Sequence, residues 1–234
     1  TFYTRLLREP AFTRNACGNV RLFISGSAPL LAETFAEFAS RTGHAILERY
    51  GMTETGMITS NPLDGVRAAG TVGRPLHGVS VRIAGEDGTA CSPGSVGAVE
   101  VRGPNVFAGY WQMPDRTREE FTADGWFRTG DVGEWVAKGP AKEYLRLAGR
   151  AKDMIISGGL NVYPKEIEEL VDAMPGVAES AVIGLPDPDF GEAVTAVVVA
   201  QPGHALRENE IIAALKLDIA TFKVPKRVHV VAEL

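Results

Sequence analysis

The sequence has 234 residues, of which 45% are hydrophobic and 23% are charged, and its formal net charge is −5. These values are typical of a globular chain that forms one large or two small domains. With 24 basic and 29 acidic residues, the chain has no basic excess that would follow a phosphate backbone. We therefore expect a mildly acidic cytoplasmic protein that does not bind nucleic acid stably.

The composition also argues against a disulfide framework, a zinc site and a membrane span. Cys17 and Cys91 have neither a CxxC neighbour nor clustered histidines. The longest apolar run in the second half, residues 193–200, has the length of a buried strand and not of a membrane helix. Residues 1–5 lack an initiator methionine and a signal-peptide pattern, which predicts that the chain begins within a longer protein.

The first part of the chain predicts two strand ends that deliver polar, glycine-containing loops. An apolar strand over 20–24 stops at the turn 25–29, and apolar residues at helical spacing over 31–39 predict a helix. A second short strand at 45–47 runs into the loop 49–54. Because ligands bind beyond the carboxyl ends of parallel strands in α/β sheets, these two loops are candidate binding segments.

From about residue 73 to residue 149 the pattern changes to short alternating runs. Alternation of this kind, separated by turn signals, predicts a small antiparallel sheet or barrel. The predicted strands lie near 79–83, 99–101 and 144–147, and the turns at 87–88, 93–94 and 124–125.

After Asp153 the sequence predicts a compact α+β unit with the order β-α-β-β-α-β. Its elements are a strand at 154–156, a helix opened by Pro164, strands at 180–183 and 194–199, a helix over 211–219 and a strand at 228–231. We expect a domain boundary near 150–153, and hence three segments: 1–72, 73–149 and 150–234.

The densest chemical signal is the sequence from Tyr50 to Glu54, YGMTE. A glycine lets the backbone approach a ligand closely, and an aromatic ring offers a flat face to a base. Thr53 offers a hydroxyl to a phosphate, and Glu54 offers a hard oxygen to Mg²⁺. The other interpretation, a strand-to-loop turn with a solvated glutamate, is equally compatible with these five residues.

Two further segments carry charged residues at positions that fit ribose binding and a hinge. Asp131 follows Gly130 at the expected start of a strand, where a carboxylate can accept both hydroxyls of a ribose, although a turn-capping aspartate fits as well. Residues 149–153 (GRAKD) precede the glycine pair Gly158 and Gly159, as a hinge followed by a close backbone approach would require. A solvated linker is the alternative for this last segment.

Taken in this order and at these separations, the three segments closely resemble the ANL superfamily of acyl-CoA synthetases, luciferases and peptide-synthetase adenylation domains. The resemblance covers nearly the whole chain, including residues 70–76, 109–111 and 222–226. It implies the C-terminal part of the ANL large domain, namely the end of an α/β sheet plus a distorted antiparallel β-barrel, followed by a small α+β domain.

The resemblance implies an enzyme that joins a carboxylate to AMP, using ATP and Mg²⁺, and then transfers the acyl group to coenzyme A. Thr53, Glu54 and Lys152 would be catalytic, with Glu54 as the metal ligand and Lys152 at the hinge. Asp131 and Arg150 would bind the ribose, and Gly158 and Gly159 would line the pantetheine channel. The loop of Gly26, Ser27, Ala28 and Pro29 would surround the adenine together with Tyr50. The remaining cofactor-binding residues would be Arg49, Gly51, Met52 and Arg146.

Two parts of the superfamily pattern are absent from this sequence. It contains no Ser/Thr/Gly-rich phosphate loop ending in Pro-Lys-Gly, and it stops at Leu234, before the position of the adenylation lysine. Lys223 and Lys226 lie upstream of that position. We therefore expect a fragment that lacks the N-terminal part of the same enzyme and cannot form acyl-adenylate alone.

Within the superfamily, residues 22–30, 48–55 and 161–167 are most similar to malonyl-CoA synthetases. A dicarboxylate needs a second cationic anchor, because leaving one partner of a buried ion pair unpaired costs about 3 to 5 kcal/mol. Arg21 is the candidate anchor, with Met52 and Met57 lining the acid pocket. A surface arginine at a strand entry is the alternative for Arg21, and Ile58 departs from the asparagine that malonate-type relatives often carry.

Three other functions remain open on sequence grounds. The acid could be a fatty or aryl acid, since those synthetases share everything but the pocket. The chain could also be a non-catalytic module that binds nucleotide or coenzyme A. A peptide-synthetase adenylation domain is the third, although no carrier segment follows. The oligomeric state is not predicted.

Overall fold

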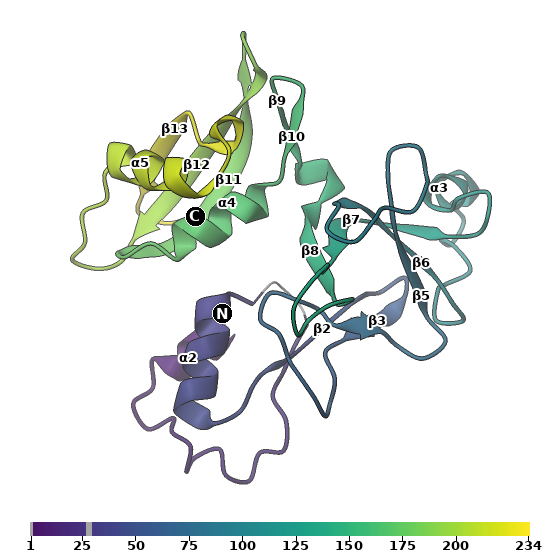
Figure 1. Ribbon diagram of the computed structural model, residues 1–234, viewed down its shortest axis with the longest axis horizontal. Helices are drawn as coiled ribbons and strands as arrows, with labels where there is room; N and C mark the ends of the chain where they lie inside the picture. Colours follow the sequence, from purple (N-terminus) through teal and green to yellow (C-terminus); the bar gives the residue numbers. More distant parts are fainter. Residues whose placement is uncertain (1, 27–29) are drawn as a thin grey trace. The chain divides into compact units, whose positions relative to one another are not determined.

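The computed structural model describes residues 2–26 and 30–234 (Figure 1). By its internal contacts the chain divides into two compact units, unit 1 (Thr1–Leu147) and unit 2 (Ala148–Leu234). In the described part of the chain, no helix combines the length and the apolar character that crossing a membrane requires. The two units are described separately.

The first sheet of unit 1 begins with two parallel strands, as expected. Strand β1 (Ile24–Ser25) pairs with β2 (Leu47–Met52), and helix α2 (Ala32–Thr42) lies between them in the sequence. Helix α1 (Phe2–Leu7) packs on α2, where Leu7, Phe38 and Ile46 form a buried cluster. The predicted helix is confirmed, but of the predicted strand over 20–24 only Ile24 pairs with β2, and β1 continues to Ser25 in the predicted turn.

The prediction that residues 49–54 form a loop is wrong for most of that segment. Residues 49–52 belong to β2, which pairs antiparallel with β3 (Gly56–Ser60), and β3 pairs with β4 (Arg74–Pro75). Gly51 makes this pairing possible, because a Cβ there would lie 2.1 Å from the carbonyl oxygen of Gly56. Only Thr53–Thr55 form the turn.

The second sheet of unit 1 confirms the predicted antiparallel strands in order β5-β6-β7-β8, and the three predicted turns are present. Within the described residues it is a four-stranded sheet and not a closed barrel. The sequence placed the start of a strand at Asp131, whereas β7 already begins at Phe127, because two glycines interrupt its alternation. The bounds are β5 (Ser80–Ala84), β6 (Gly97–Arg102), α3 (Pro114–Glu120), β7 (Phe127–Trp135) and β8 (Leu145–Arg150).

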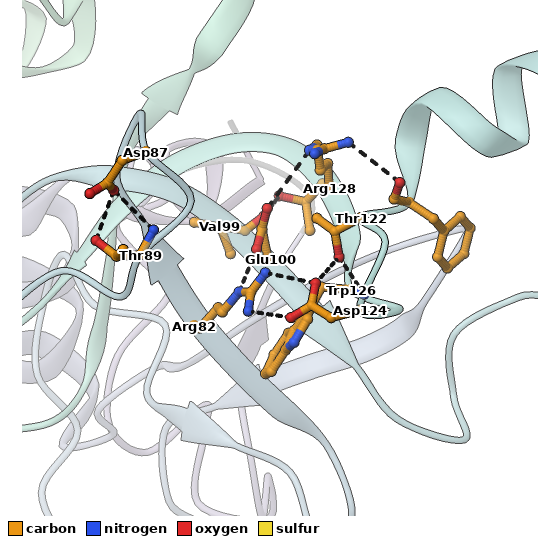
Figure 2. A network of polar contacts seen from close by, with 11 residues as sticks. Arg82, Asp87, Thr89, Val99, Glu100, Thr122, Asp124, Trp126 and Arg128 are labelled. Atoms are coloured by element: carbon orange, nitrogen blue, oxygen red, sulfur yellow. Dashed lines mark hydrogen bonds and ion pairs between the residues drawn. The ribbon is translucent and has the colours of Figure 1, made fainter.

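A network of hydrogen bonds centred on Arg82 holds the turn before β7 against this sheet (Figure 2). The Arg82 guanidinium donates to Glu100 Oε2 at 2.5 Å and to Asp124 Oδ2 at 2.8 Å. It also lies 4.6 Å from the centre of the Trp126 ring, and Arg102 lies 4.5 Å from the same ring. The hydrogen bonds that Asp124 accepts from Arg82 and from Thr122 hold the pKa of its carboxyl at about 2. The network fixes where β7 begins.

Unit 2 confirms the predicted β-α-β-β-α-β order, with one additional strand, β10. The buried apolar strand β12 is central: β11 and β9 pair with it antiparallel, and β13 parallel. Helices α4 and α5 pack on the sheet and on each other (Figure 1). The bounds are η1 (Ala151–Asp153), β9 (Ile155–Ser157), β10 (Leu160–Val162), α4 (Pro164–Asp172), β11 (Val177–Asp187), β12 (Gly191–Ala200), α5 (Glu208–Asp218), η2 (Thr221–Lys223) and β13 (Arg227–Val231).

Two half-buried carboxylates on α4 make unit 2 sensitive to pH. Glu168 accepts a hydrogen bond from the Val182 amide at 2.8 Å, and Asp172 accepts one from Ser180 Oγ at 2.7 Å. Burial raises the pKa of both carboxyls above their ordinary values, and negative neighbours raise them further. The folded unit therefore holds protons more tightly than the unfolded chain.

We expect unit 2 to gain stability as the pH falls from 7 through these raised pKa values, with the gain complete below the ordinary values of 4.5 and 3.8. Glu168→Gln removes the buried charge and keeps an acceptor for Val182. This variant should slow amide exchange in β11 and β12 at pH 7 by a factor below about ten. It should also make the stability of unit 2 depend less on pH. Glu233→Gln, at an exposed position of the same unit, is the control. Faster exchange in Glu168→Gln at pH 7 would contradict the expectation.

Candidate functional site

Asp131 lies in a bulge of β7 and not at the start of a strand, as the sequence had suggested. Phe127 and Arg128 pair with β6 on one side of the bulge, and Val132 pairs on the other, so residues 129–131 together face Val99 alone. Gly130 adopts a φ of +76°, which favours glycine. Such a bulge turns a side chain out of the regular alternation, and bulges are frequent beside active sites.

The residue Asp131 is 7% exposed, and its carboxylate is held by Tyr50, whose hydroxyl donates to Asp131 Oδ2. The backbone amide of Asp131 donates to Thr129 Oγ1 at 3.1 Å. The hydrogen bond between Tyr50 and Asp131 joins β2 to β7, two segments 81 residues apart in the sequence. Two of the three sequence signals therefore meet in one place.

Tyr50 itself lies mainly in the core. Its ring is 8% exposed and packs with a buried cluster of Ile58, Ile83, Val99, Val101 and Leu145. Ile58, the position that departs from the malonate pattern, is the additional residue in a bulge of β3 opposite Tyr50 and Gly51. The expected contact of Tyr50 with adenine stays a prediction.

The turn that carries Glu54 is held by the segment between β6 and α3. Tyr110 Oη donates to Glu54 Oε1 at 3.2 Å, and the Phe107 amide donates to the Glu54 carbonyl at 2.8 Å. The Asn105 side chain donates to the carbonyl of Thr55 at 2.7 Å. Burial, with Glu54 beside it, raises the pKa of Tyr110, so the phenol keeps its proton and remains a donor.

Glu54 fits Mg²⁺ only as one ligand among several. In the residues that the structure describes, no three acidic, histidine or cysteine side chains gather as a complete metal site. Mg²⁺ at phosphate-transfer sites is held by one or two carboxylates together with substrate phosphates. A single, half-buried carboxylate at a strand turn matches that donor set.

The end of β1 lies against β2, and Gly26, the first residue of the expected adenine loop, follows it. A Cβ on Gly26 would lie 2.8 Å from Arg49 Cγ, so glycine permits the close approach. Arg49 and Thr53 are exposed, whereas Met52 is partly buried. Ser27, Ala28 and Pro29 lie outside the described residues.

The other sequence-predicted residues of unit 1 have three different surroundings. Met57 lies against Gly51, where its Cε would be 2.7 Å from an added Cβ. Arg146 donates to Glu134 Oε1 at 3.0 Å across β7 and β8. Arg21 is exposed and precedes β1. The structure thus engages Arg146 with a protein carboxylate, which sequence reasoning did not foresee.

The predicted residues of unit 2 fall at its beginning. Arg150 ends β8, Lys152 is exposed in η1, and Gly158 and Gly159 form the exposed turn between β9 and β10. Both glycines have positive φ, +60° and +78°. The backbone conformation of the turn therefore explains both glycines, whether or not a ligand binds beside them.

Two residues beside this turn were missed by sequence reasoning. The Gly158 amide donates to the Phe190 carbonyl at 2.8 Å, and the Lys226 ammonium lies 4.3 Å from the centre of the Phe190 ring. Phe190 is 41% exposed. The sequence signal for Phe190 was an aromatic residue next to the glycine at the start of β12. Its proximity to Gly158 could not be predicted, because it arises from the pairing of β9 with β12.

The comparison with known families agrees with the two units. A model described as AMP-binding enzyme matches residues 1–111, and one described as AMP-binding enzyme C-terminal domain matches residues 166–234. The chain belongs to the AMP-binding enzyme family. The predicted resemblance to adenylate-forming acyl-CoA synthetases is thereby confirmed, as is the mixed α/β and α+β fold class.

Three curated relatives in the AMP-binding family differ in the acid they are named for. A mitochondrial malonate–CoA ligase, ACSF3, of Mus musculus is 41% identical over 100% of this chain and 43% of its own length. A sulfoacetate–CoA ligase of Cupriavidus necator is also 41% identical, over 100% and 45%. A feruloyl-CoA synthase of Amycolatopsis is 38% identical, over 98% and 46%. The chain spans less than half the length of these relatives.

Two solved structures of the AMP-binding family support the same assignment. ATP-bound MatB from Rhodopseudomonas palustris has a TM-score of 0.94 and 55% identity, covering 100% of this chain and 46% of that one. The o-succinylbenzoate-CoA synthetase MenE from Bacillus subtilis, in complex with an acyl-adenylate, has a TM-score of 0.80 and 28% identity, covering 99% and 46%.

Proposed function

We propose that the whole protein containing this chain is an acid–thiol ligase that activates a small carboxylic acid with ATP and transfers it to coenzyme A. The observation that carries the proposal is the hydrogen bond between Tyr50 and Asp131, which joins two of the segments to which the superfamily resemblance assigns nucleotide binding. The similarity to an ATP-bound and an acyl-adenylate-bound structure supports the same chemistry.

In the first half-reaction an anionic carboxylate must approach an anionic triphosphate, so charge must be neutralised as it develops. Bound Mg²⁺ would supply that positive charge at the phosphates. Glu54 would hold the metal, and Thr53 would donate its hydroxyl to the α-phosphate. Asp131 would accept the ribose hydroxyls while Tyr50 keeps its carboxylate in place. The adenine loop would be Gly26, Ser27, Ala28 and Pro29.

In the second half-reaction unit 2 would present the thiol of coenzyme A. Gly158 and Gly159 would leave room for the pantetheine arm, since neither has a side chain. Phe190 offers a ring face and Lys226 a positive charge beside this turn, which suits the nucleotide end of coenzyme A. Lys152 would serve as the hinge, and Arg150 would complete the ribose contact. The division into segments 1–72, 73–149 and 150–234 belongs to this proposal.

We propose malonate, or a closely related small dianion, as the acid. Two of the relatives are named for malonate and sulfoacetate, each of which carries a second anionic group beyond the carboxylate that is activated. Arg21 would pair with that group, and Met52 and Met57 would line the pocket. An aryl acid is the second candidate, because the feruloyl-CoA synthase is 38% identical. We propose a cytoplasmic location, although the mouse relative is named as mitochondrial.

A substrate panel on the full-length protein tests the proposal. Malonate, sulfoacetate, a fatty acid and ferulate would each be supplied with ATP, Mg²⁺ and coenzyme A, and thioester and pyrophosphate would be measured. We expect malonate to give the highest kcat/KM. Arg21→Ala should raise the malonate KM by a factor of about 10 to 100, as the loss of one charge-assisted hydrogen bond of about 1.5 to 3 kcal/mol does, and leave the KM for ATP unchanged.

Equal effects of Arg21→Ala on malonate and ATP would remove Arg21 from this role. Arg5→Ala, at another exposed arginine of unit 1, is the matched control. Absence of any thioester with all four acids would contradict the ligase itself. The 234-residue chain alone should release no pyrophosphate, and robust release by it would refute the expectation that it is an inactive fragment.

A further inference from the structure

The hydroxyl of Tyr110 is directed at the residue to which the proposed function assigns Mg²⁺. It donates to Glu54 Oε1 at 3.2 Å. A carboxylate has two oxygens, so a hydrogen bond to one of them fixes the plane of the group and leaves the other for a metal. Side chains that orient a metal ligand in this way commonly change metal affinity by about 10- to 100-fold when they are removed.

Tyr110 is itself held on three sides, as a positioning group must be. Its backbone amide donates to Thr117 Oγ1 at 2.9 Å. Its ring meets the Phe107 ring edge to face at 4.8 Å, and the Arg116 guanidinium lies 4.5 Å from its centre. The preceding Gly109 adopts a φ of +146°, and a Cβ there would lie 2.6 Å from Thr117 Cγ2. The phenol therefore has little freedom to leave Glu54.

The same segment also fixes the backbone of the Glu54 turn. The Phe107 backbone amide donates to the Glu54 carbonyl at 2.8 Å, and the Asn105 side-chain amide donates to the Thr55 carbonyl at 2.7 Å. Backbone and carboxylate of Glu54 are thus held by residues that lie about fifty positions away in the sequence. This arrangement distinguishes Glu54 from an exposed turn glutamate, whose carboxylate would rotate freely.

We infer that Tyr110 is a positioning residue for Glu54 and sets the concentration of Mg²⁺ that the enzyme requires. The inference rests on the proposed function, because it presumes that Glu54 binds the metal that accompanies ATP. Tyr110 touches neither ATP nor the acid in this scheme. Its loss should weaken Mg²⁺ binding and leave the KM for the acid unchanged.

The test compares the full-length wild type with Tyr110→Phe, which removes only the hydroxyl. One measurement is the Mg²⁺ concentration that gives half-maximal pyrophosphate release. The other is the Mg²⁺ concentration that gives half of the ATP-dependent rise in melting temperature without the acid, which involves no chemistry. We expect Tyr110→Phe to raise both about tenfold. Values equal to or below those of the wild type would overturn the inference.

Tyr144→Phe is the matched control, because its hydroxyl donates to a backbone carbonyl, that of Val66, at 2.9 Å. It should lower the melting temperature without changing either Mg²⁺ value, and an equal shift in both variants would overturn the inference. If Tyr110→Phe does not fold, Thr117→Val loosens the same residue and should raise both values about threefold. An unchanged value in that variant would likewise overturn the inference.

Glu54→Gln separates this inference from the proposed function. Wild-type dependence on Mg²⁺ in Glu54→Gln would show that Glu54 does not hold the metal, and the proposed function would fail at that point. A strong effect of Glu54→Gln with no effect of Tyr110→Phe would leave the proposed function intact and remove Tyr110 from the positioning role.

Discussion

Glu54→Gln should lower kcat/KM for acyl-adenylate formation by about 10²- to 10³-fold in the full-length protein, as the loss of one electrostatic contact to a transition state commonly does. Glutamine has the same shape and can still accept the hydrogen bond from Tyr110. It cannot supply the negative charge that keeps Mg²⁺ beside the phosphates. The measurement is pyrophosphate release at saturating acid, over a range of Mg²⁺ concentrations.

Glu143→Gln is the control for that result. Glu143 is an exposed acid of the same unit whose ion pair with Arg74 spans 3.7 Å, and exposed pairs of this kind contribute little. The control should retain wild-type kcat/KM. A Glu54→Gln enzyme within threefold of the wild type would contradict the assignment of Glu54 as a metal ligand.

Asp131→Asn should raise the KM for ATP by about 10- to 100-fold, because each charge-assisted hydrogen bond to the ribose contributes about 1.5 to 3 kcal/mol. The amide retains one acceptor, but it cannot accept from both ribose hydroxyls and from Tyr50 at once. The fall in affinity should also appear as weaker binding of AMP by calorimetry, which requires no reaction.

Two variants separate the ribose contact from the structure around it. Asp124→Asn makes the same change in the turn before β7, at a residue that belongs to the Arg82 network, and should leave the KM for ATP unchanged. Tyr50→Phe removes the bond that holds Asp131 and should have an intermediate effect. If Asp131→Asn binds AMP as the wild type does, Asp131 is a structural residue of the bulge.

Local patterns in the sequence were sufficient for the regular parts of the fold. The helix α2 has apolar residues at helical spacing and ends at Gly43, and the order of strands and helices in unit 2 follows from alternation, Pro164 and the apolar run of β12. These features depend on residues close together in the chain, where periodicity and turn chemistry decide the backbone. The start of strand β7 was placed at Asp131 and lies at Phe127, because Gly130 and Gly133 interrupt that pattern.

The sequence alone determined the family and the residue types of the candidate site, because short motifs in a fixed order do not require coordinates to be recognised. Only the tertiary structure decided which side chains meet: Tyr50 with Asp131 across a bulge, and Tyr110 with Glu54 across 56 positions of the chain. The physical reason is that strand pairing and bulges are set by contacts between distant segments, which no local pattern records.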